Sequence, residues 1–152
     1  MFKFGKRSLT NLAGVHKDLV QVAEKGIALS DIDFSVIEGV RTVETQRIYV
    51  AKGASKTMNS RHLTGHAIDV VALIGNKVRY DFDLYYSVAR AMQEAARFYK
   101  TPLRWGACWV RIDSTARRLE DLVTEYVQNC QATGKRPLLD AAHFELPQSH
   151  YP

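Results

Sequence analysis

SRHLTGHAID (residues 60–69) and DAAHFEL (residues 140–146) are the two segments that decide how this chain of 152 residues is interpreted. Together they supply two imidazoles and one carboxylate, from His62, Asp69 and His143, as candidate ligands of a metal ion. A catalytic zinc site has three such protein ligands and keeps one position for water. The residue types therefore predict a metal site that supports hydrolysis.

The local patterns explain how distant ligands could meet. Alternate side chains of a strand share a face, so His143 and Glu145 should point one way while Phe144 points into the core. Asp69 should likewise leave a buried strand on its polar face. Gly65 allows a turn that brings the preceding histidine toward Asp69. Asp140, three residues before His143, is placed to take a proton from water and pass it to a leaving amine.

Spacing alone leaves alternatives open. His66 is a competing ligand four residues after His62, and that spacing occurs in metalloprotease helices, but the adjacent glutamate is missing and Gly65 disfavours a helix. Without a metal, His62 and His66 would be surface loop residues and His143 a hydrogen-bonded core residue. Spacing by itself gives these two interpretations equal weight.

Composition indicates one globular domain. With 46% hydrophobic and 24% charged residues the chain can bury a core and is not disordered. The formal net charge of +5 comes from scattered, interleaved residues, so we expect no nucleic-acid partner. This excess either favours encounter with an anionic polymer or is an ordinary solvated surface.

The cysteines and the N-terminus indicate which cellular compartment and which kinds of cross-link to expect. Cys108 and Cys130 form neither a disulfide framework nor a paired-cysteine zinc motif. The charged start at residues 1–7 is followed by no apolar run, so we expect no secretory signal and no stable membrane insertion.

Periodicity predicts an α+β fold, a small and mainly antiparallel sheet with flanking helices, in a single domain that carries the zinc site. The expected helices run from Ser8 through Ile27, over 44–51, over 84–98, and from Ser114 to just before Gly134. The expected strands cover 33–40, 67–74, 77–80, 103–110 and 142–146, with a loop at 53–59.

The two opening segments also resemble a known family. Ser-x-His-x-x-Gly-x-Ala-x-Asp (60–69), followed by Asp-x-x-His-Phe-Glu-Leu (140–146), is similar to the signature of zinc D-alanyl-D-alanine carboxypeptidases and dipeptidases and of phage L-alanyl-D-glutamate endopeptidases. FKFGK (2–6), GVRT (39–42) and WGACW (105–109) resemble the phage endolysin branch. The likeness spans nearly the whole chain, except a longer stretch around 115–136.

This resemblance implies roles for individual residues. It implies three zinc ligands, His62, Asp69 and His143. It makes Asp140 the catalytic acid/base and Arg41 the group that binds substrate and stabilises the oxyanion. Gln46 and Ser60 fall at positions near the substrate, and Glu145 would orient a ligand imidazole.

Two positions depart from the family pattern. His66 stands where relatives often have Asp or another polar residue, so it is not a family ligand. Cys108 stands where relatives commonly have Asp, which removes any substrate contact that this acid would make.

The expected function is that of a phage endolysin that hydrolyses the L-alanyl-D-glutamate bond of peptidoglycan stem peptides. Residues 1–152 would form one peptidase catalytic domain without a cell-wall-binding module, working as a monomer. It would wait in the host bacterial cytoplasm and need a separate membrane-permeabilising protein to reach the periplasmic wall. The alternatives are a D-alanyl-D-alanine carboxypeptidase or dipeptidase, and a non-catalytic zinc-stabilised binding module in which His66 or Glu145 completes the coordination.

Overall fold

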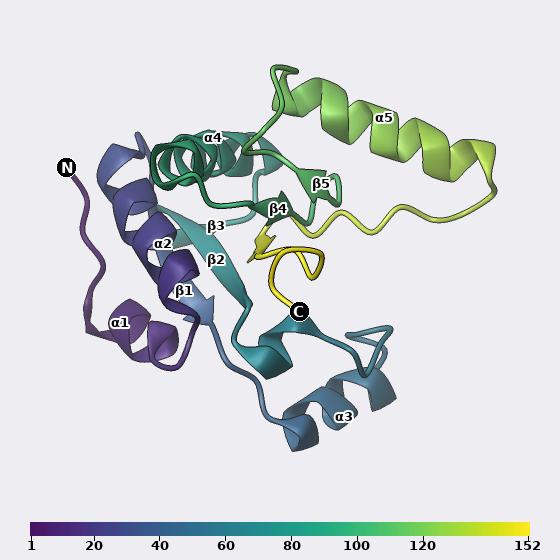
Figure 1. Ribbon diagram of the computed structural model, residues 1–152, viewed down its shortest axis with the longest axis horizontal. Coiled ribbons are helices and arrows are strands. Elements are labelled where there is room, and N and C mark those ends of the chain that lie inside the picture. Colours follow the sequence, from purple (N-terminus) through teal and green to yellow (C-terminus); the bar gives the residue numbers. More distant parts are fainter.

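A computed structural model describes all residues from 1 to 152. Its centre is an antiparallel sheet in the order β1-β2-β6-β4-β5, with β3 also pairing with β2 (Figure 1). The strands are β1 (Asp33–Glu38), β2 (Ala67–Ile74), β3 (Lys77–Arg79), β4 (Arg104–Trp105), β5 (Val110–Arg111) and β6 (His143–Glu145). The predicted α+β class and the small antiparallel sheet are confirmed.

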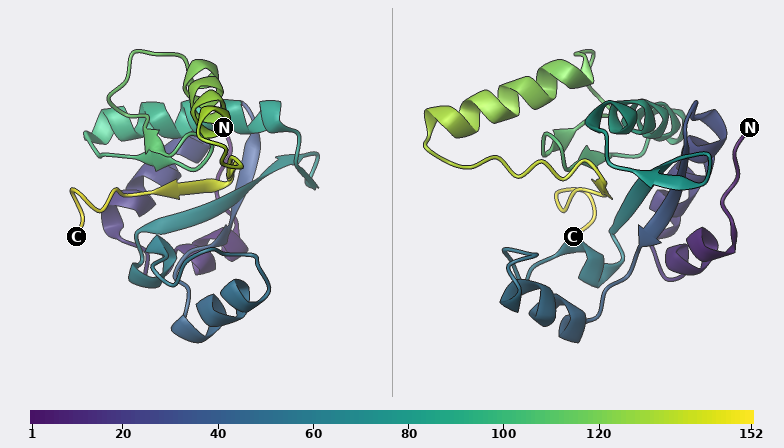
Figure 2. Two further views of the ribbon diagram at one scale, coloured as in Figure 1. Left: turned by 90° about the vertical axis from the view of Figure 1, so that its right-hand side faces the viewer. Right: turned by 180° about the vertical axis from the view of Figure 1, so that it is seen from behind.

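The helices are α1 (Lys6–Leu12), α2 (Lys17–Leu29), α3 (Val43–Ala51), α4 (Phe82–Tyr99) and α5 (Leu119–Ala132), together with the 3₁₀ helix η1 (Arg61–Thr64). Helices α2 and α4 pack against each other, with Gly26 allowing close approach to Met92, and their apolar faces join the core. The polar side chains of Asp69 in β2 and of His143 and Glu145 in β6 lie on the opposite face of the sheet. Seen from behind, helix α5 and helix α1 lie toward opposite ends of the molecule (Figure 2, right). None of the helices has the length and hydropathy needed to cross a bilayer.

One predicted helix is two. The expected continuous helix from Ser8 to Ile27 is divided into α1 and α2 by a turn in which Gly14 has φ 84°. Ser8 does not cap a helix: its hydroxyl lies inside α1 and accepts a hydrogen bond from the amide of Val36 at 3.0 Å. The ring of His16 caps α2 by accepting from the Asp18 amide. A regular apolar spacing continued across the break and concealed it.

Two further predictions of element boundaries are wrong. The expected strand at 103–110 is a hairpin of β4 and β5, because residues 106–109 form a turn in which Trp109 has φ 58°. Cys108 is therefore buried in that turn and not in a strand. Helix α5 begins at Leu119 and not at Ser114. The helices at 44–51 and 84–98, the hairpin of β2 and β3, and the terminal strand are confirmed to within a few residues. Both cysteines are free, as expected.

Candidate metal centre and active-site cleft

His62 is fixed by a short turn of backbone. The Ser60 hydroxyl caps η1 by accepting from the His62 amide at 3.2 Å, and Gly65 ends η1 in the left-handed region with φ 76°. The His62 side chain is buried, and its Nδ1 lies 2.9 Å from the Gly39 carbonyl oxygen. Because a carbonyl can only accept, Nδ1 donates to Gly39, and Nε2 is the nitrogen that faces Asp69. That Nε2 lies 3.3 Å from Asp69 Oδ2.

Asp69 and His143 come together through strand register. They are directly paired residues of β2 and β6, so their side chains leave the sheet on one face. His143 Nδ1 lies 3.2 Å from Asp69 Oδ1. Their neighbours Ile68, Val70 and Phe144 are fully buried on the opposite face. Asp69 and His143 therefore lie on the face opposite to these core residues, as predicted.

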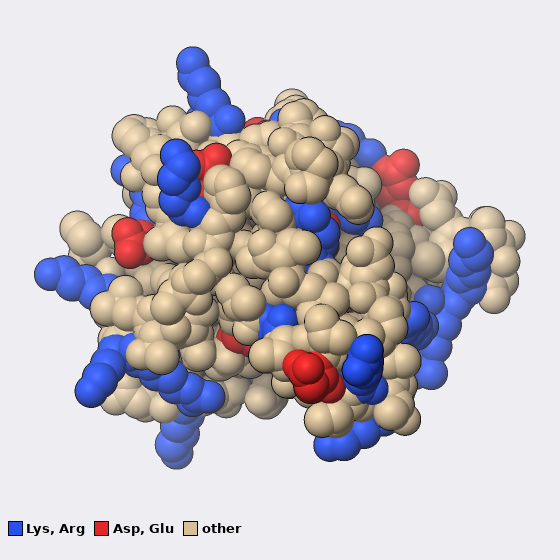
Figure 3. All heavy atoms as spheres, turned by 60° about the horizontal axis from the view of Figure 1, so that its bottom comes forward, with Lys and Arg blue, Asp and Glu red and all other residues tan.

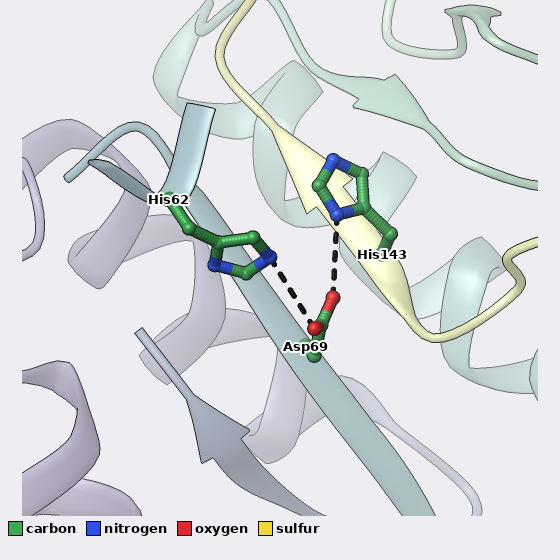
Figure 4. A group of neighbouring side chains, drawn as sticks. All are labelled: His62, Asp69 and His143. Carbon is green, nitrogen blue, oxygen red and sulfur yellow. Dashed lines mark hydrogen bonds and ion pairs between the residues drawn. The ribbon is translucent and has the colours of Figure 1, made fainter. Parts of the chain in front are cut away.

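The three side chains point at one another from η1, β2 and β6 (Figure 4). One ligand atom from each of His62, Asp69 and His143 lies within 4.8 Å of the other two. The outward nitrogen of His143, Nε2, lies 2.8 Å from Glu145 Oε1, so both imidazoles are oriented by an acceptor behind them. Metal-binding histidines have this arrangement, in which the far nitrogen donates and the near nitrogen binds. The donor set fits a zinc ion.

The electrostatics of the cluster favour a cation beside Asp69. Burial disfavours the charged form of Asp69, but hydrogen bonds from His143 and His62 outweigh it and lower the pKa of the carboxyl well below its usual range. Burial also opposes protonation of His143, yet its bonds to Asp69 and Glu145 raise its pKa to about 9. A metal ion bound here must displace that proton, so metal binding competes with protons.

Asp140 lies beside this cluster in a tight turn. Its amide donates to the Gly106 carbonyl at 3.0 Å, and its own carbonyl accepts from the His143 amide at 3.1 Å. Burial, and then the charge of Asp69, raise the pKa of the Asp140 carboxyl. A buried carboxyl in a cleft with a raised pKa is a candidate proton donor and acceptor.

Arg41 approaches the cluster from the other side. Its Nη2 lies 3.8 Å from Asp69 Oδ2, and its guanidinium also contacts Glu38, Gln46 Oε1 at 2.7 Å and the ring face of Tyr49. The side chain is only 8% exposed, so Arg41 is not a solvated surface arginine. Gln46 is fully buried behind Arg41, and it contacts Arg41 without lining the cleft.

A cleft of about 580 Å³ contains most of the predicted site residues, namely Arg41, Ser60, His62, Asp69, Asp140, His143 and Glu145. His66 lies elsewhere, among the rings of His16 and Tyr151, and is not part of the ligand cluster. Lys and Arg side chains outnumber Asp and Glu on the face drawn in Figure 3, and some lie in its recesses. Further lining residues that sequence reasoning missed are Glu38, Lys56, Arg104, Trp109 and Leu138. They come from separate segments, and only the pairing of β4 with β6 could have pointed to Arg104.

Comparisons with known proteins agree with this geometry. A Serratia marcescens L-Ala D-Glu endopeptidase, ChiX, superposes with a TM-score of 0.78 at 36% identity, over 99% of this chain and 94% of that one. The L-alanyl-D-glutamate peptidase of Escherichia phage T5 is 37% identical over 112 residues, which cover 71% of this chain and 82% of the relative. That of Listeria phage A118 is 33% identical over 106 residues, 68% of this chain but only 37% of the longer relative. The family described as phage L-alanyl-D-glutamate peptidase matches residues 1–146. This chain belongs to that peptidase family.

Proposed function

We propose that this chain is a zinc-dependent endopeptidase that hydrolyses the L-alanyl-D-glutamate bond in the stem peptides of bacterial peptidoglycan. The family membership supports the peptidase activity and the bond. The observation that carries the zinc assignment is the convergence of His62 Nε2, Asp69 and His143 Nδ1, each imidazole held from behind by its own acceptor.

His62, Asp69 and His143 would hold the metal, since two imidazoles and a carboxylate suit zinc and leave room for water. Bound zinc supplies Lewis acidity, which polarises a scissile carbonyl and lowers the pKa of water. Glu145 keeps the imidazole of His143 in the orientation that presents Nδ1. Ser60 maintains the turn that carries His62.

Asp140 would act as the acid/base. Its carboxylate takes a proton from the attacking water and delivers it to the amine nitrogen of the leaving D-glutamyl residue. Burial and the charge of Asp69 raise the pKa of this carboxyl, which makes it easier to protonate than an exposed aspartate. Its place in the turn before His143 holds it next to the metal ligands.

Arg41 would stabilise the oxygen on which negative charge develops. Its guanidinium is already oriented by Glu38, Gln46 and Tyr49, so little reorganisation is needed during the reaction. The role of Gln46 is then to position Arg41. This assignment places a fixed positive group on the β1 and α3 side of the triad.

The biological setting follows as part of the proposal. A peptidase of this family, with residues 1–152 acting as one catalytic unit, would work as a phage endolysin on the wall of its host. It would be made in the host cytoplasm and act after a separate protein has permeabilised the membrane.

Digestion of purified peptidoglycan, analysed by mass spectrometry, tests the bond. We expect a new free amine on D-glutamate and stem peptides released from glycan-linked L-alanine. Release of D-alanine alone would make the enzyme a carboxypeptidase, and retention of the polymer without release would make it a binding module.

Metal analysis tests the zinc assignment independently. His62→Ala and His143→Ala should each lose the stoichiometric zinc and the activity while circular dichroism shows a folded protein. His66→Ala is the matched control, because His66 is a nearby half-buried histidine outside the triad, and it should keep both. Zinc retained at one equivalent after dialysis of the two triad variants would defeat the assignment.

A further inference from the structure

Arg104 lies on the same sheet face as the metal triad, in the neighbouring row of paired residues. Asp69 is paired with His143 across β2 and β6, and Glu145 of β6 is paired with Arg104 of β4. Because side chains alternate, Arg104 and Glu145 share the cleft face, whereas the next pair, Trp105 and Phe144, stacks in the core. The register thus places a second guanidinium beside the triad, on the side opposite to Arg41.

The protein holds this guanidinium at one edge only. Arg104 Nε donates to the Trp109 carbonyl oxygen at 2.8 Å, and Nη1 lies 3.4 Å from Glu145 Oε2. The guanidinium also lies over the Trp109 ring, 5.2 Å from its centroid. No protein acceptor engages Nη2, and the side chain is 37% exposed into the cleft. Arg104 is oriented but still has donors to offer a ligand.

Two other arginines near Arg104 are already paired with carboxylates, and Arg61, which also lines the cleft, donates to the carbonyl oxygens of Leu146 and Tyr151. Arg41 is nearly buried, and its contacts are Glu38, Gln46 and Asp69. Arg111, which is paired with Arg104 across β4 and β5, forms a two-point bond with Asp113 at 2.7 and 3.2 Å. Arg104 shares Glu145 with His143, so its positive charge is only partly balanced.

Trp109 fixes the wall on which Arg104 rests. It has φ 58°, a strained conformation for a bulky residue, and such strain is retained where the surrounding structure imposes it. Its indole nitrogen donates to the Leu138 carbonyl at 2.9 Å, and its ring lies 5.3 Å from that of His143. The tryptophan therefore ties the Arg104 side of the cleft to the segment that leads into Asp140.

Asp140 and Arg104 lie on the same side of the triad. The Asp140 turn packs on Gly106, in the turn that follows β4, and the preceding segment is bound by Trp109. In the proposed reaction Asp140 protonates the amine of the leaving residue, so this side of the cleft receives that residue. A glutamyl residue has two carboxyl groups, and since only one continues the chain, the other is a free carboxylate next to the scissile bond.

We propose that Arg104 determines specificity by binding the free carboxylate of the glutamyl residue that follows the scissile bond. This inference rests on the proposed endopeptidase function. It adds the residue that recognises the leaving glutamyl residue. A guanidinium offers a carboxylate paired, charge-assisted hydrogen bonds, which a neutral primary amide cannot accept in the same way. The enzyme should therefore discriminate between a D-glutamyl residue with a free carboxylate and its amidated counterpart.

A pair of synthetic peptides tests this proposal. Both contain L-alanyl-D-glutamate followed by L-lysine, and the carboxyl group of glutamate that does not continue the chain is free in one and a primary amide in the other. We expect wild-type kcat/KM to be about 10- to 100-fold higher for the carboxylate peptide, the scale of a hydrogen-bonded charge pair. In Arg104→Gln the ratio of the two kcat/KM values should fall to near one, because only the value for the carboxylate peptide should drop strongly. Arg104→Lys should retain an intermediate ratio.

Matched variants separate this role from others. Arg118→Gln removes the same charge from an exposed arginine at the start of α5, paired with Glu120, and should leave the ratio unchanged. Lys56→Gln tests another cation that lines the cleft. Zinc content measured in each variant reports whether His143, oriented by Glu145, still holds the metal.

The outcomes are distinguishable. If wild-type enzyme cleaves both peptides equally well, or Lys56→Gln and not Arg104→Gln abolishes the preference, the assignment of Arg104 is wrong and the endopeptidase function stands. If Arg104→Gln lowers kcat/KM equally for both peptides, the residue acts only by positioning Glu145, and the proposal is overturned. If wild-type enzyme with bound zinc cleaves neither peptide, the proposed function fails as well.

Discussion

The packing of Gly106 against the Asp140 turn makes Gly106→Ala a direct test of how the proposed site is held. A Cβ at this position would lie 2.4 Å from the Asp140 carbonyl oxygen and 2.9 Å from His143 Cβ, whereas ordinary contact begins at 3.4 Å. The Asp140 turn must therefore move away by about 1 Å. That movement strains two backbone hydrogen bonds, from the Gly106 amide to His143 and from the Asp140 amide to Gly106.

The magnitude follows from these contacts. Overpacking costs about 1–3 kcal/mol, and weakening the two hydrogen bonds adds roughly 1 kcal/mol. The free energy of unfolding should therefore fall by about 2–4 kcal/mol, which a typical domain survives. Displacing a catalytic group by 1 Å can cost about 100-fold in rate, so kcat/KM should fall by that order in a protein that remains folded. Urea unfolding gives the change in the free energy of unfolding, and peptide hydrolysis gives the change in kcat/KM. Both are measured on one preparation of known zinc content.

Gly5→Ala is the control, because a Cβ at Gly5 would meet nothing within 4 Å. As Gly5 is the N-cap of α1, this change should cost at most about 1 kcal/mol and leave kcat/KM intact. Wild-type stability and activity in Gly106→Ala would show that the Asp140 turn adjusts freely, and the rigid-turn argument would then be wrong.

Three further changes test separate parts of the site and fold. Asp140→Asn should keep its zinc while kcat drops by roughly 100-fold or more, and Glu145→Gln should do less harm; the reverse order would identify Glu145 as the base. Arg41→Lys keeps the charge but loses the planar fork, so we expect turnover to fall at least about 10-fold with zinc unchanged, and unaltered kinetics would remove Arg41 from the mechanism. Burial opposes ionisation of Asp113, but hydrogen bonds from Arg111 and the Leu103 amide outweigh it and lower its pKa, so its stabilisation is complete above an ordinary pKa of about 4 and is lost as the pH falls further. Asp113→Asn should therefore flatten the loss of stability below about pH 4 in urea titrations, and an unchanged pH profile would contradict this.

Much of the clustering of His62, Asp69 and His143 could be predicted because strand alternation and a local turn orient these side chains. Strand alternation places His143 and Glu145 on one face, and it does the same for Asp69 in β2. The turn at Gly65 is also local, since a left-handed residue there reverses the chain after His62. What alternation could not supply is the pairing of β2 with β6, which sets Asp69 opposite His143.

The elements that sequence reasoning missed depend on contacts that periodicity does not contain. The apolar pattern continues in phase through α1 and α2 across Gly14. Periodicity alone therefore does not reveal the break between the two helices. The hairpin of β4 and β5 requires Trp109 in a conformation that propensity disfavours, and its tertiary bond to Leu138 fixes it. Arg104 resembled any surface arginine until the pairing of β4 with β6 placed it in the cleft.

The shortness of β6 explains why the site depends on the core. This strand has only three residues, so backbone pairing alone holds it weakly. Its middle residue, Phe144, is fully buried and stacks on Trp105 of β4, while the flanking His143 and Glu145 face the cleft. Phe144, which anchors the strand, therefore also helps to position the His143 imidazole on the opposite face. A smaller side chain at Phe144 would leave a cavity beneath His143, and since packed interiors transmit such changes, zinc affinity should respond to a residue that never reaches the cleft.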